Sequence, residues 1–130
     1  MHQNKISIII NKPIEEVFAF TTNPQNTHLW YSSIKEEISS EYPPKINTEY
    51  KNRGGGKSEW SCYKVSEFKN NEKFALVDSE GNYNVKYTYK KLNDNQTKME
   101  YFEWVEKGEL ESPFTEKELA KLKVAIGDKK

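Results

Sequence analysis

The chain has 130 residues with equal numbers of cationic and anionic side chains, 20 of each. This length suits one globular domain, so residues 1–130 are expected to form a single domain. Leu, Ile, Val and Phe make up only 27 residues, close to the ~20% level typical of disordered chains. The 17 aromatic residues and the zero net charge offset that deficit. We therefore expect a folded domain with an unusually aromatic core.

Composition argues against several classes of partner. A net charge of zero, with Arg53 as the only arginine, disfavours binding to nucleic acids or anionic membranes. With Cys62 as the only cysteine, an internal disulfide and a cysteine-rich metal site are excluded. The apolar run Ile8–Ile10 is too short for a signal sequence or a membrane span. The prediction is a cytoplasmic protein without a metal, a cofactor, a nucleic-acid partner or membrane insertion.

The chain is predicted to begin with a strand and two short helices. Alternating β-branched residues predict the strand at residues 5–11. Pro13 followed by two glutamates is typical of a helix start. Asn23-Pro24 ends this helix, and residues 26–31 are predicted to form a second helical turn.

Six short segments rich in β-branched and aromatic residues follow, and each is predicted to be a strand. These segments are residues 34–39, 47–53, 58–68, 73–78, 83–91 and 98–106. Clusters of proline, glycine and asparagine separate them, and such short connections favour antiparallel pairing. A C-terminal helix then follows and ends at Gly127. Two starts are possible for it, either Ser112-Pro113 or a cap at Thr115 with Glu118 three residues later.

Alternation along the strands predicts which side chains face the interior. The inward set of the strand at 83–91 is Tyr83, Val85, Tyr87 and Tyr89. In the last strand neither face is purely polar, so two sets are possible. The set of Met99, Tyr101, Glu103 and Val105 is preferred as inward, because the set of Glu100, Phe102, Trp104 and Glu106 begins and ends in glutamate. Tyr63 and Val65 are also expected to face inward, and Glu59 and Ser61 follow them unless a bulge intervenes.

The C-terminal helix is the natural cover for this inward face, because Leu119, Leu122 and Ile126 form an apolar stripe along it. Tyrosines packed against a helix fill space less densely than aliphatic side chains and carry hydroxyls that need partners. Two interpretations fit this pattern. The space holds a cavity, water or a ligand, or it is a solid core whose tyrosine hydroxyls reach solvent at the sheet edges.

Several short motifs occur in a fixed order over nearly the whole chain. They are Pro13-Ile14-Glu15-Glu16-Val17-Phe18, Asn23-Pro24, Trp30 with Ile34, Asn47-Thr48-Glu49-Tyr50, Tyr63-Lys64-Val65-Ser66-Glu67, and the helix from Leu119 to Ile126. In this order they resemble the START/Bet v 1-like superfamily, specifically its polyketide cyclase/dehydrase-like branch. The chain departs from that pattern in having Asn47 where a glycine is usual and in its shorter final helix.

The resemblance implies an α+β helix-grip fold. In this fold a curved antiparallel sheet of about seven strands wraps a C-terminal helix, with two short helices after the first strand. It also implies a cavity for a lipid-, sterol- or polyketide-like ligand between the sheet and that helix. The residues expected to contact the ligand are Trp30, Tyr31, Tyr50, Tyr63, Val65, Tyr83, Val85, Tyr87, Tyr89, Met99, Tyr101, Glu103, Leu119 and Leu122.

A few residues are candidates for chemistry. His28 at the cavity mouth and Glu103 in an apolar cavity are the candidate acid–base residues. Glu59 and Glu36 are carboxylates of the same kind. Gly54-Gly55-Gly56-Lys57-Ser58 ends like a phosphate-binding loop, but its spacing fails and a strand follows, so a hairpin turn is predicted there.

Three functions of different classes follow. The leading hypothesis is non-enzymatic binding of a small hydrophobic molecule between the sheet and the C-terminal helix. The second is a cyclase or dehydratase that uses Glu103 or His28. The third is an interaction module or a homodimer, in which a second chain covers apolar surface around Phe102 and Trp104.

Overall fold

A computed structural model describes residues 2–54 and 59–128. Within these ranges the elements follow the predicted order, from a strand through two short helices and six strands to a final helix. They are β1 (Gln3–Ile10), α1 (Ile14–Thr22), η1 (Pro24–Leu29), β2 (Glu36–Ser39), β3 (Glu49–Arg53), β4 (Ser61–Lys69), β5 (Lys73–Asp78), β6 (Tyr83–Asn93), β7 (Gln96–Val105) and α2 (Glu116–Ile126). Positions 55–58 of the predicted glycine-rich turn lie outside the described residues.

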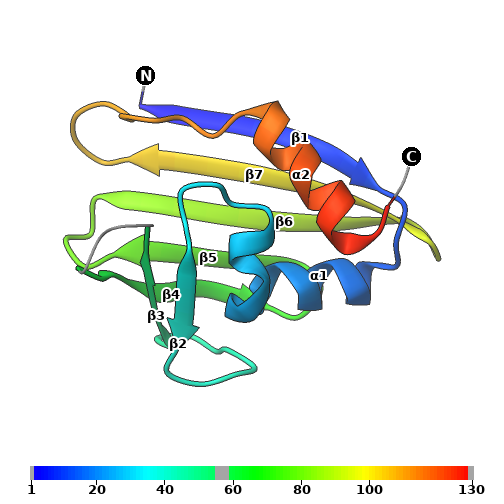
Figure 1. The fold of residues 1–130 in the computed structure, drawn as a ribbon, viewed down its shortest axis with the longest axis horizontal. Helices are drawn as coiled ribbons and strands as arrows, with labels where there is room; N and C mark the ends of the chain where they lie inside the picture. The colour runs from blue at the N-terminus through cyan, green and yellow to red at the C-terminus, as the bar shows by residue number, and fades with distance from the viewer. Residues whose placement is uncertain (1, 55–58, 129–130) are drawn as a thin grey trace.

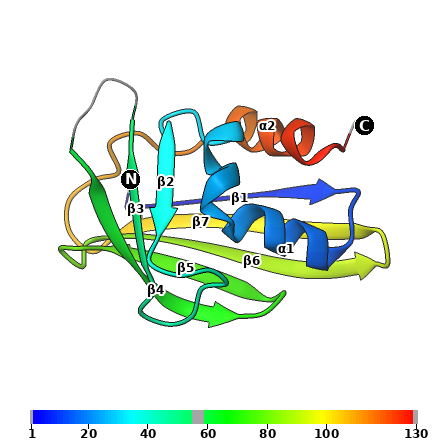
Figure 2. The same cartoon turned by 60° about the horizontal axis from the view of Figure 1, so that its bottom comes forward.

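The seven strands form one antiparallel sheet in the order β1-β7-β6-β5-β4-β3-β2. β1 and β2 therefore occupy opposite edges, and the first strand pairs with the last. The sheet curves, and α1, η1 and α2 all lie over one of its faces (Figures 1 and 2). This arrangement confirms the predicted α+β helix-grip fold.

Local sequence signals account for the ends of both α-helices. Pro13, with φ −60°, immediately precedes α1, where its fixed φ suits a helix start. The Thr115 hydroxyl oxygen accepts a hydrogen bond from the Glu118 backbone N–H at 3.3 Å and caps α2. Gly127 ends α2 in the left-handed region, with φ 92°. The predicted cap and stop of this helix are thus confirmed.

Some predicted boundaries were wrong by one to three residues. The second helix spans 24–29 instead of 26–31 and is a 3-10 helix, with its backbone N–H groups bonded three residues back, as from Trp30 to Thr27 at 3.2 Å. The strand predicted at 47–53 starts at Glu49, because Asn47 adopts φ 73° in the preceding turn. The left-handed region favours glycine and also accepts asparagine, so Asn47 fits the position where the resemblance leads us to expect glycine.

The predicted inward faces are confirmed. Tyr87 and Tyr89 on β6 are each 6% exposed, and Met99 and Tyr101 on β7 are fully buried. The bulge in β4 lies between Val65 and Glu67, beyond the stretch from Ser61 to Val65, so the alternation there is unbroken.

Candidate functional site

The structure contains a pocket of about 580 Å³ between the segment from η1 to β3 and the inner face of β4, β5 and β6. The lining residues come from every strand from β2 to β6, from α1 and η1, and from the loop between η1 and β2. They are Thr21, Thr27, Tyr31, Ser32, Ser33, Ile34, Lys35, Glu37, Tyr50, Asn52, Arg53, Gly54, Glu59, Ser61, Tyr63, Phe74, Leu76, Tyr83, Val85 and Tyr87. No described residue of α2 belongs to this set.

The pocket is apolar and aromatic at its base and polar at its rim. The lining side chains that are buried from solvent include Tyr50, Phe74, Leu76, Val85 and Tyr87. The exposed lining residues are Ser32, Ser33, Lys35, Glu59 and Ser61. Such a gradient, with a few polar groups around an apolar base, is common in small-molecule sites.

Glu37 is the acidic side chain that lies deepest in this lining. It is half-buried on β2, where its carboxylate accepts hydrogen bonds from the Thr27 hydroxyl at 2.6 Å and from the Asn52 amide at 3.1 Å. Burial raises the pKa of Glu37 above its usual value, although these two hydrogen bonds act in the opposite direction. Its charge also helps to raise the pKa values of Tyr50 and Tyr63, so its field extends into the pocket.

The neighbouring Glu36 differs from Glu37 in its exposure to solvent and in its hydrogen-bond partner. It is exposed, and its carboxylate binds Arg53 across the β2–β3 pair with N–O distances of 2.7 and 3.0 Å. The Arg53 guanidinium in turn lies 4.4 Å from the centre of the Trp60 ring. The Arg53 side chain is therefore directed to Glu36 and Trp60. Among the described side chains, no cation pairs with Glu37.

We expect Glu37→Gln to raise the free energy of unfolding at pH 7.5 by on the order of 1 kcal/mol, because it removes a half-buried charge. The folded-state pKa of Glu37 lies above the unfolded one. Its contribution to stability is therefore full at pH values below the unfolded pKa and is lost as the pH rises through the folded pKa. Urea denaturation of the wild type and Glu37→Gln at pH 4 and pH 7.5 measures the difference in stability. Glu37→Gln should be more stable than the wild type only at pH 7.5. In contrast, exposed Glu36→Gln should change stability by less than about 0.5 kcal/mol at either pH.

A chain of tyrosine hydroxyls connects the pocket to a second buried carboxylate. The hydroxyls of Tyr31 and Tyr101 lie 2.8 Å apart, and those of Tyr101 and Tyr83 lie 3.5 Å apart. Tyr83 donates to Glu103 at 2.6 Å. Burial raises the pKa of Tyr31 to about 12 and raises the pKa of Tyr83 as well. Both phenols are therefore neutral at physiological pH.

Glu103 is 2% exposed and binds three groups of its own chain. Besides Tyr83, it accepts hydrogen bonds from the Asn4 side-chain amide at 2.9 Å and the Phe114 backbone N–H at 2.6 Å. It therefore joins β1, β6 and the segment that leads into α2 to the C-terminal end of β7. Its inward orientation was predicted correctly. However, the structure places it outside the pocket lining.

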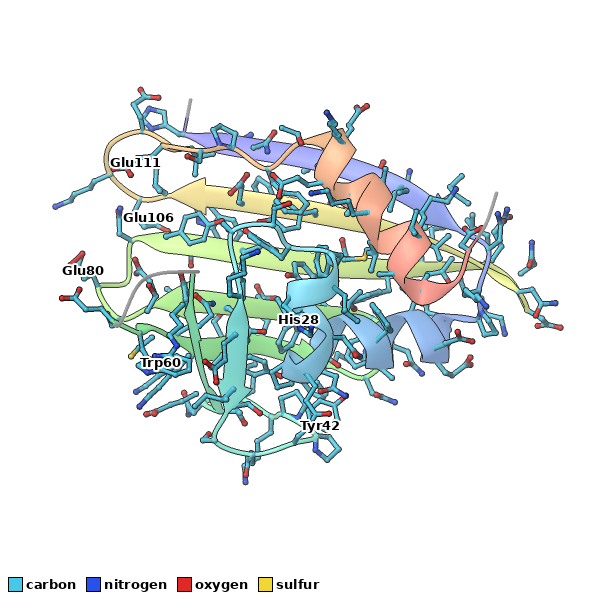
Figure 3. All side chains as sticks on the ribbon, viewed as in Figure 1. His28, Tyr42, Trp60, Glu80, Glu106 and Glu111 are labelled. Atoms are coloured by element: carbon cyan, nitrogen blue, oxygen red, sulfur yellow. The ribbon has the colours of Figure 1, made fainter. Side chains whose placement is uncertain are left out.

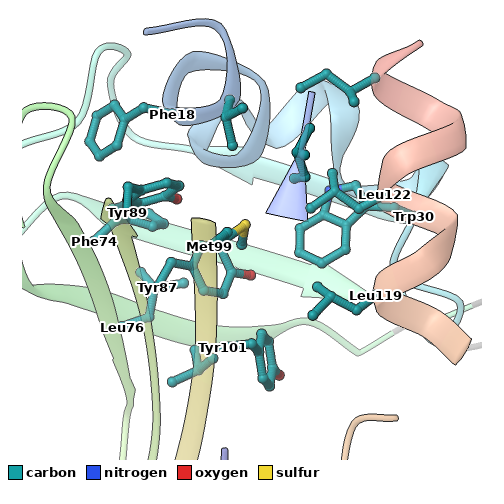
Figure 4. Packing of buried hydrophobic residues seen from close by; sticks show 14 of the residues in the cluster. Phe18, Trp30, Phe74, Leu76, Tyr87, Tyr89, Met99, Tyr101, Leu119 and Leu122 are labelled. Carbon is teal, nitrogen blue, oxygen red and sulfur yellow. The ribbon is translucent and has the colours of Figure 1, made fainter. Parts of the chain in front are cut away.

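This pocket differs in position from the predicted cavity, because none of its described lining residues belongs to α2. Leu119 and Leu122 of α2 are buried in the core cluster with Trp30 and Met99 (Figure 4). Phe114 belongs to the same cluster. Of the predicted contact residues, six do line the pocket, namely Tyr31, Tyr50, Tyr63, Tyr83, Val85 and Tyr87. The other eight belong to the packed core or its hydrogen-bond network, namely Trp30, Val65, Tyr89, Met99, Tyr101, Glu103, Leu119 and Leu122.

The structure also locates the other candidates. His28 is exposed on η1 (Figure 3) and lies outside the pocket lining. Neither His28 nor Glu103 therefore contacts the pocket directly. Glu59 and Ser61 line the rim. Sequence reasoning missed Glu37, because it singled out the adjacent Glu36.

Comparison with known proteins bears on the fold. No protein-family model and no curated protein matches the sequence. Solved structures do match. A START superfamily protein from Mycobacterium smegmatis has a TM-score of 0.74 at 13% identity over 97% of both chains. The Aha1 dimer from Colwellia psychrerythraea has a TM-score of 0.70 at 16% identity over 100% of both chains. The chain has the START/Bet v 1-like fold.

CalU16 from Micromonospora echinospora is a further match, with a TM-score of 0.66 at 14% identity over 96% of this chain and 76% of that one. Identities this low establish the START/Bet v 1-like fold and nothing about ligands. Within residues 2–54 and 59–128, no helix is long and apolar enough to span a membrane. Over the same ranges, no three His, Cys, Asp or Glu side chains converge as metal ligands would.

Proposed function

We propose that the protein binds a small, largely apolar molecule in the pocket formed by η1 and β2 to β6. The observation that carries this proposal is the pocket itself, about 580 Å³ with a buried aromatic and aliphatic base. That volume falls within the range of roughly 300–1,000 Å³ that is usual for small-molecule sites. The ligand classes implied by the resemblance, which are lipid-, sterol- and polyketide-like molecules, have the apolar character that this base requires.

The Tyr87 hydroxyl also supports the proposal. Tyr87 is 6% exposed and lines the pocket, and its ring contacts Trp30, Phe74 and Tyr101. Among the described residues, however, nothing forms a hydrogen bond with its hydroxyl. In the part of the chain that the structure describes, Trp30 Nε1 is the only fully buried side-chain polar atom without a hydrogen-bond partner. The Tyr87 hydroxyl is therefore accessible from the pocket, where a polar group of a bound molecule would provide a partner.

The affinity of such a site can be estimated for a simple probe, 1-decanol. Burying ten carbons supplies at most ~8 kcal/mol, at ~0.8 kcal/mol per CH₂ group. The entropy lost on association subtracts several kcal/mol from this. Calorimetric titration should therefore give saturable binding with a dissociation constant between micromolar and millimolar.

Ser61→Trp is expected to weaken 1-decanol binding at least tenfold, because Ser61 lines the rim and an indole there occupies the pocket. Lys64→Trp is the matched control, since Lys64 is exposed on the same strand and lies outside the pocket lining. It should bind 1-decanol as the wild type does. Absence of binding to the wild type, or equal binding by Ser61→Trp, would show that this pocket is not the site.

The alternative function, an interaction module or a homodimer, has weaker support. Phe102 and Trp104 stack with ring centres 4.8 Å apart on the outer face of the sheet. Lys5 lies 4.9 Å from the centre of the Phe102 ring, and Glu106 accepts a hydrogen bond from the Trp104 indole at 3.1 Å. Both rings are thus half-covered by their own chain. One structure with the same fold is described as a dimer, and a homodimer of this chain stays a prediction.

A further inference from the structure

Resting on the proposed function, we infer that the ligand of this pocket carries a basic amine, which as an ammonium group pairs with Glu37. The binding site for that group is the carboxylate of Glu37 at the junction of η1, β2 and β3. The remainder of the ligand occupies the aromatic and aliphatic base of the pocket.

The geometry around Glu37 supports this assignment. An ionised carboxylate has about four acceptor positions, and Thr27 and Asn52 use two of them, one on each oxygen. These two donors are side chains of different elements, so they hold the carboxylate in one orientation. Acceptor positions therefore remain available for a donor inside the pocket.

The charges around Glu37 favour a cationic donor over a neutral one. A carboxylate removed from water is costly unless it is paired, yet no lysine or arginine in the described part of the chain pairs with Glu37. Arg53, the obvious candidate, is held by Glu36 at 2.7 Å. Of the other charged lining residues, Lys35 and Glu59 are exposed at the rim. Among the described lining residues, the positive groups are thus Lys35 at the rim and Arg53, which already binds Glu36, so neither pairs with Glu37.

The aromatic lining fits the same ligand. Tyr50 lines the pocket, and Tyr63 faces it in β3–β4 register. Aromatic faces attract ammonium groups. A carboxylate near two tyrosine rings therefore complements a cation and repels an anionic group such as a fatty-acid carboxylate.

Three probes with the same ten-carbon chain test this inference, namely decylamine, 1-decanol and decanoate. Each is titrated calorimetrically at pH 7.5 and below its micelle-forming concentration into the wild type, Glu37→Gln and Glu59→Gln. We expect the wild type to bind decylamine about tenfold more tightly than 1-decanol, because a charge-assisted hydrogen bond is about twice as strong as a neutral one. Decanoate should bind most weakly.

In Glu37→Gln the preference for decylamine should disappear, while the affinity for 1-decanol stays within twofold of the wild type. Glu59→Gln removes the same charge from the exposed rim and should keep the preference. Asn52→Lys provides an independent check, because Asn52 lies opposite Glu37 in the β2–β3 register and a lysine there would pair with it. Because that pair has no net charge, the variant should lose the preference for decylamine over 1-decanol.

The outcomes separate the inference from the proposed function. If 1-decanol binds the wild type as tightly as decylamine, or if the preference survives in Glu37→Gln, the amine assignment is wrong and the apolar pocket stands. If none of the three probes binds, the proposed function itself is wrong. A preference that is lost equally in Glu59→Gln would reflect the general charge of the rim and would also overturn the assignment.

Discussion

Glu103→Ala is expected to lower the free energy of unfolding by about 3–5 kcal/mol. The side chain is 2% exposed and accepts hydrogen bonds from Tyr83, Asn4 and the Phe114 backbone. Truncation leaves the buried Phe114 N–H without its acceptor and removes one acceptor from the half-buried Asn4 and Tyr83 side chains. Each such loss costs about 1–3 kcal/mol when the donor finds no other partner. Urea denaturation monitored by tryptophan fluorescence measures the loss.

Two further variants serve as comparisons for Glu103→Ala. Glu103→Gln keeps the shape but places an amide donor against donors, so we expect it to cost less than Glu103→Ala and more than about 1 kcal/mol. Glu100→Ala lies on the same strand in register with Ser7 and Thr88 and should change stability by less than about 0.5 kcal/mol. A loss below about 1 kcal/mol for Glu103→Ala would show that Glu103 does not hold the segment before α2 to the sheet.

Leu122→Ala is the second substitution with a large expected effect, about 3 kcal/mol of lost stability. Leu122 is fully buried beneath α2 in the core that includes Trp30 and Met99. Val124 on the same helix is 78% exposed, and Val124→Ala should change stability by less than about 0.5 kcal/mol. Denaturation midpoints of both variants give the comparison.

This pair of variants also distinguishes the two positions considered for the ligand. If the space beneath α2 were a cavity, Leu122 would have few neighbours to lose, and truncation would cost about 1 kcal/mol or less. Binding of 1-decanol provides a second readout. Because Leu122 lies outside the pocket lining, folded Leu122→Ala should bind 1-decanol as the wild type does.

The sequence was informative where a pattern repeats over several residues. The alternation of Tyr83, Val85, Tyr87 and Tyr89 predicted the inner face of β6, and the same period correctly turned Glu103 inward among Met99 and Tyr101. Turn residues between the strands predicted the antiparallel order, because short connections permit little else. Thr115 and Gly127 marked the cap and the end of α2.

The position of the pocket could not be predicted in the same way. β2 is only four residues long and begins with two glutamates, so no alternation shows which of them faces the interior. The answer depends on pairing with β3, which sets Glu36 opposite Arg53 and Glu37 opposite Asn52. Likewise, the strand patterns show that tyrosines face inward. They do not show which part of the inner face the helices cover and which part remains open as a pocket.

The pairing of β1 with β7 has a consequence for folding during synthesis. Gln3 lies opposite Trp104, and Ile10 lies opposite Thr97, so the first strand to leave the ribosome finds its partner only after most of the chain has been made. Until then β1 has an unpaired edge and four exposed isoleucines that favour contact with other chains. Closing so long a loop also makes this the pairing with the greatest entropic cost in the sheet. The meander from β3 to β7 can pair locally before β1 docks, which makes attachment of β1 a late step.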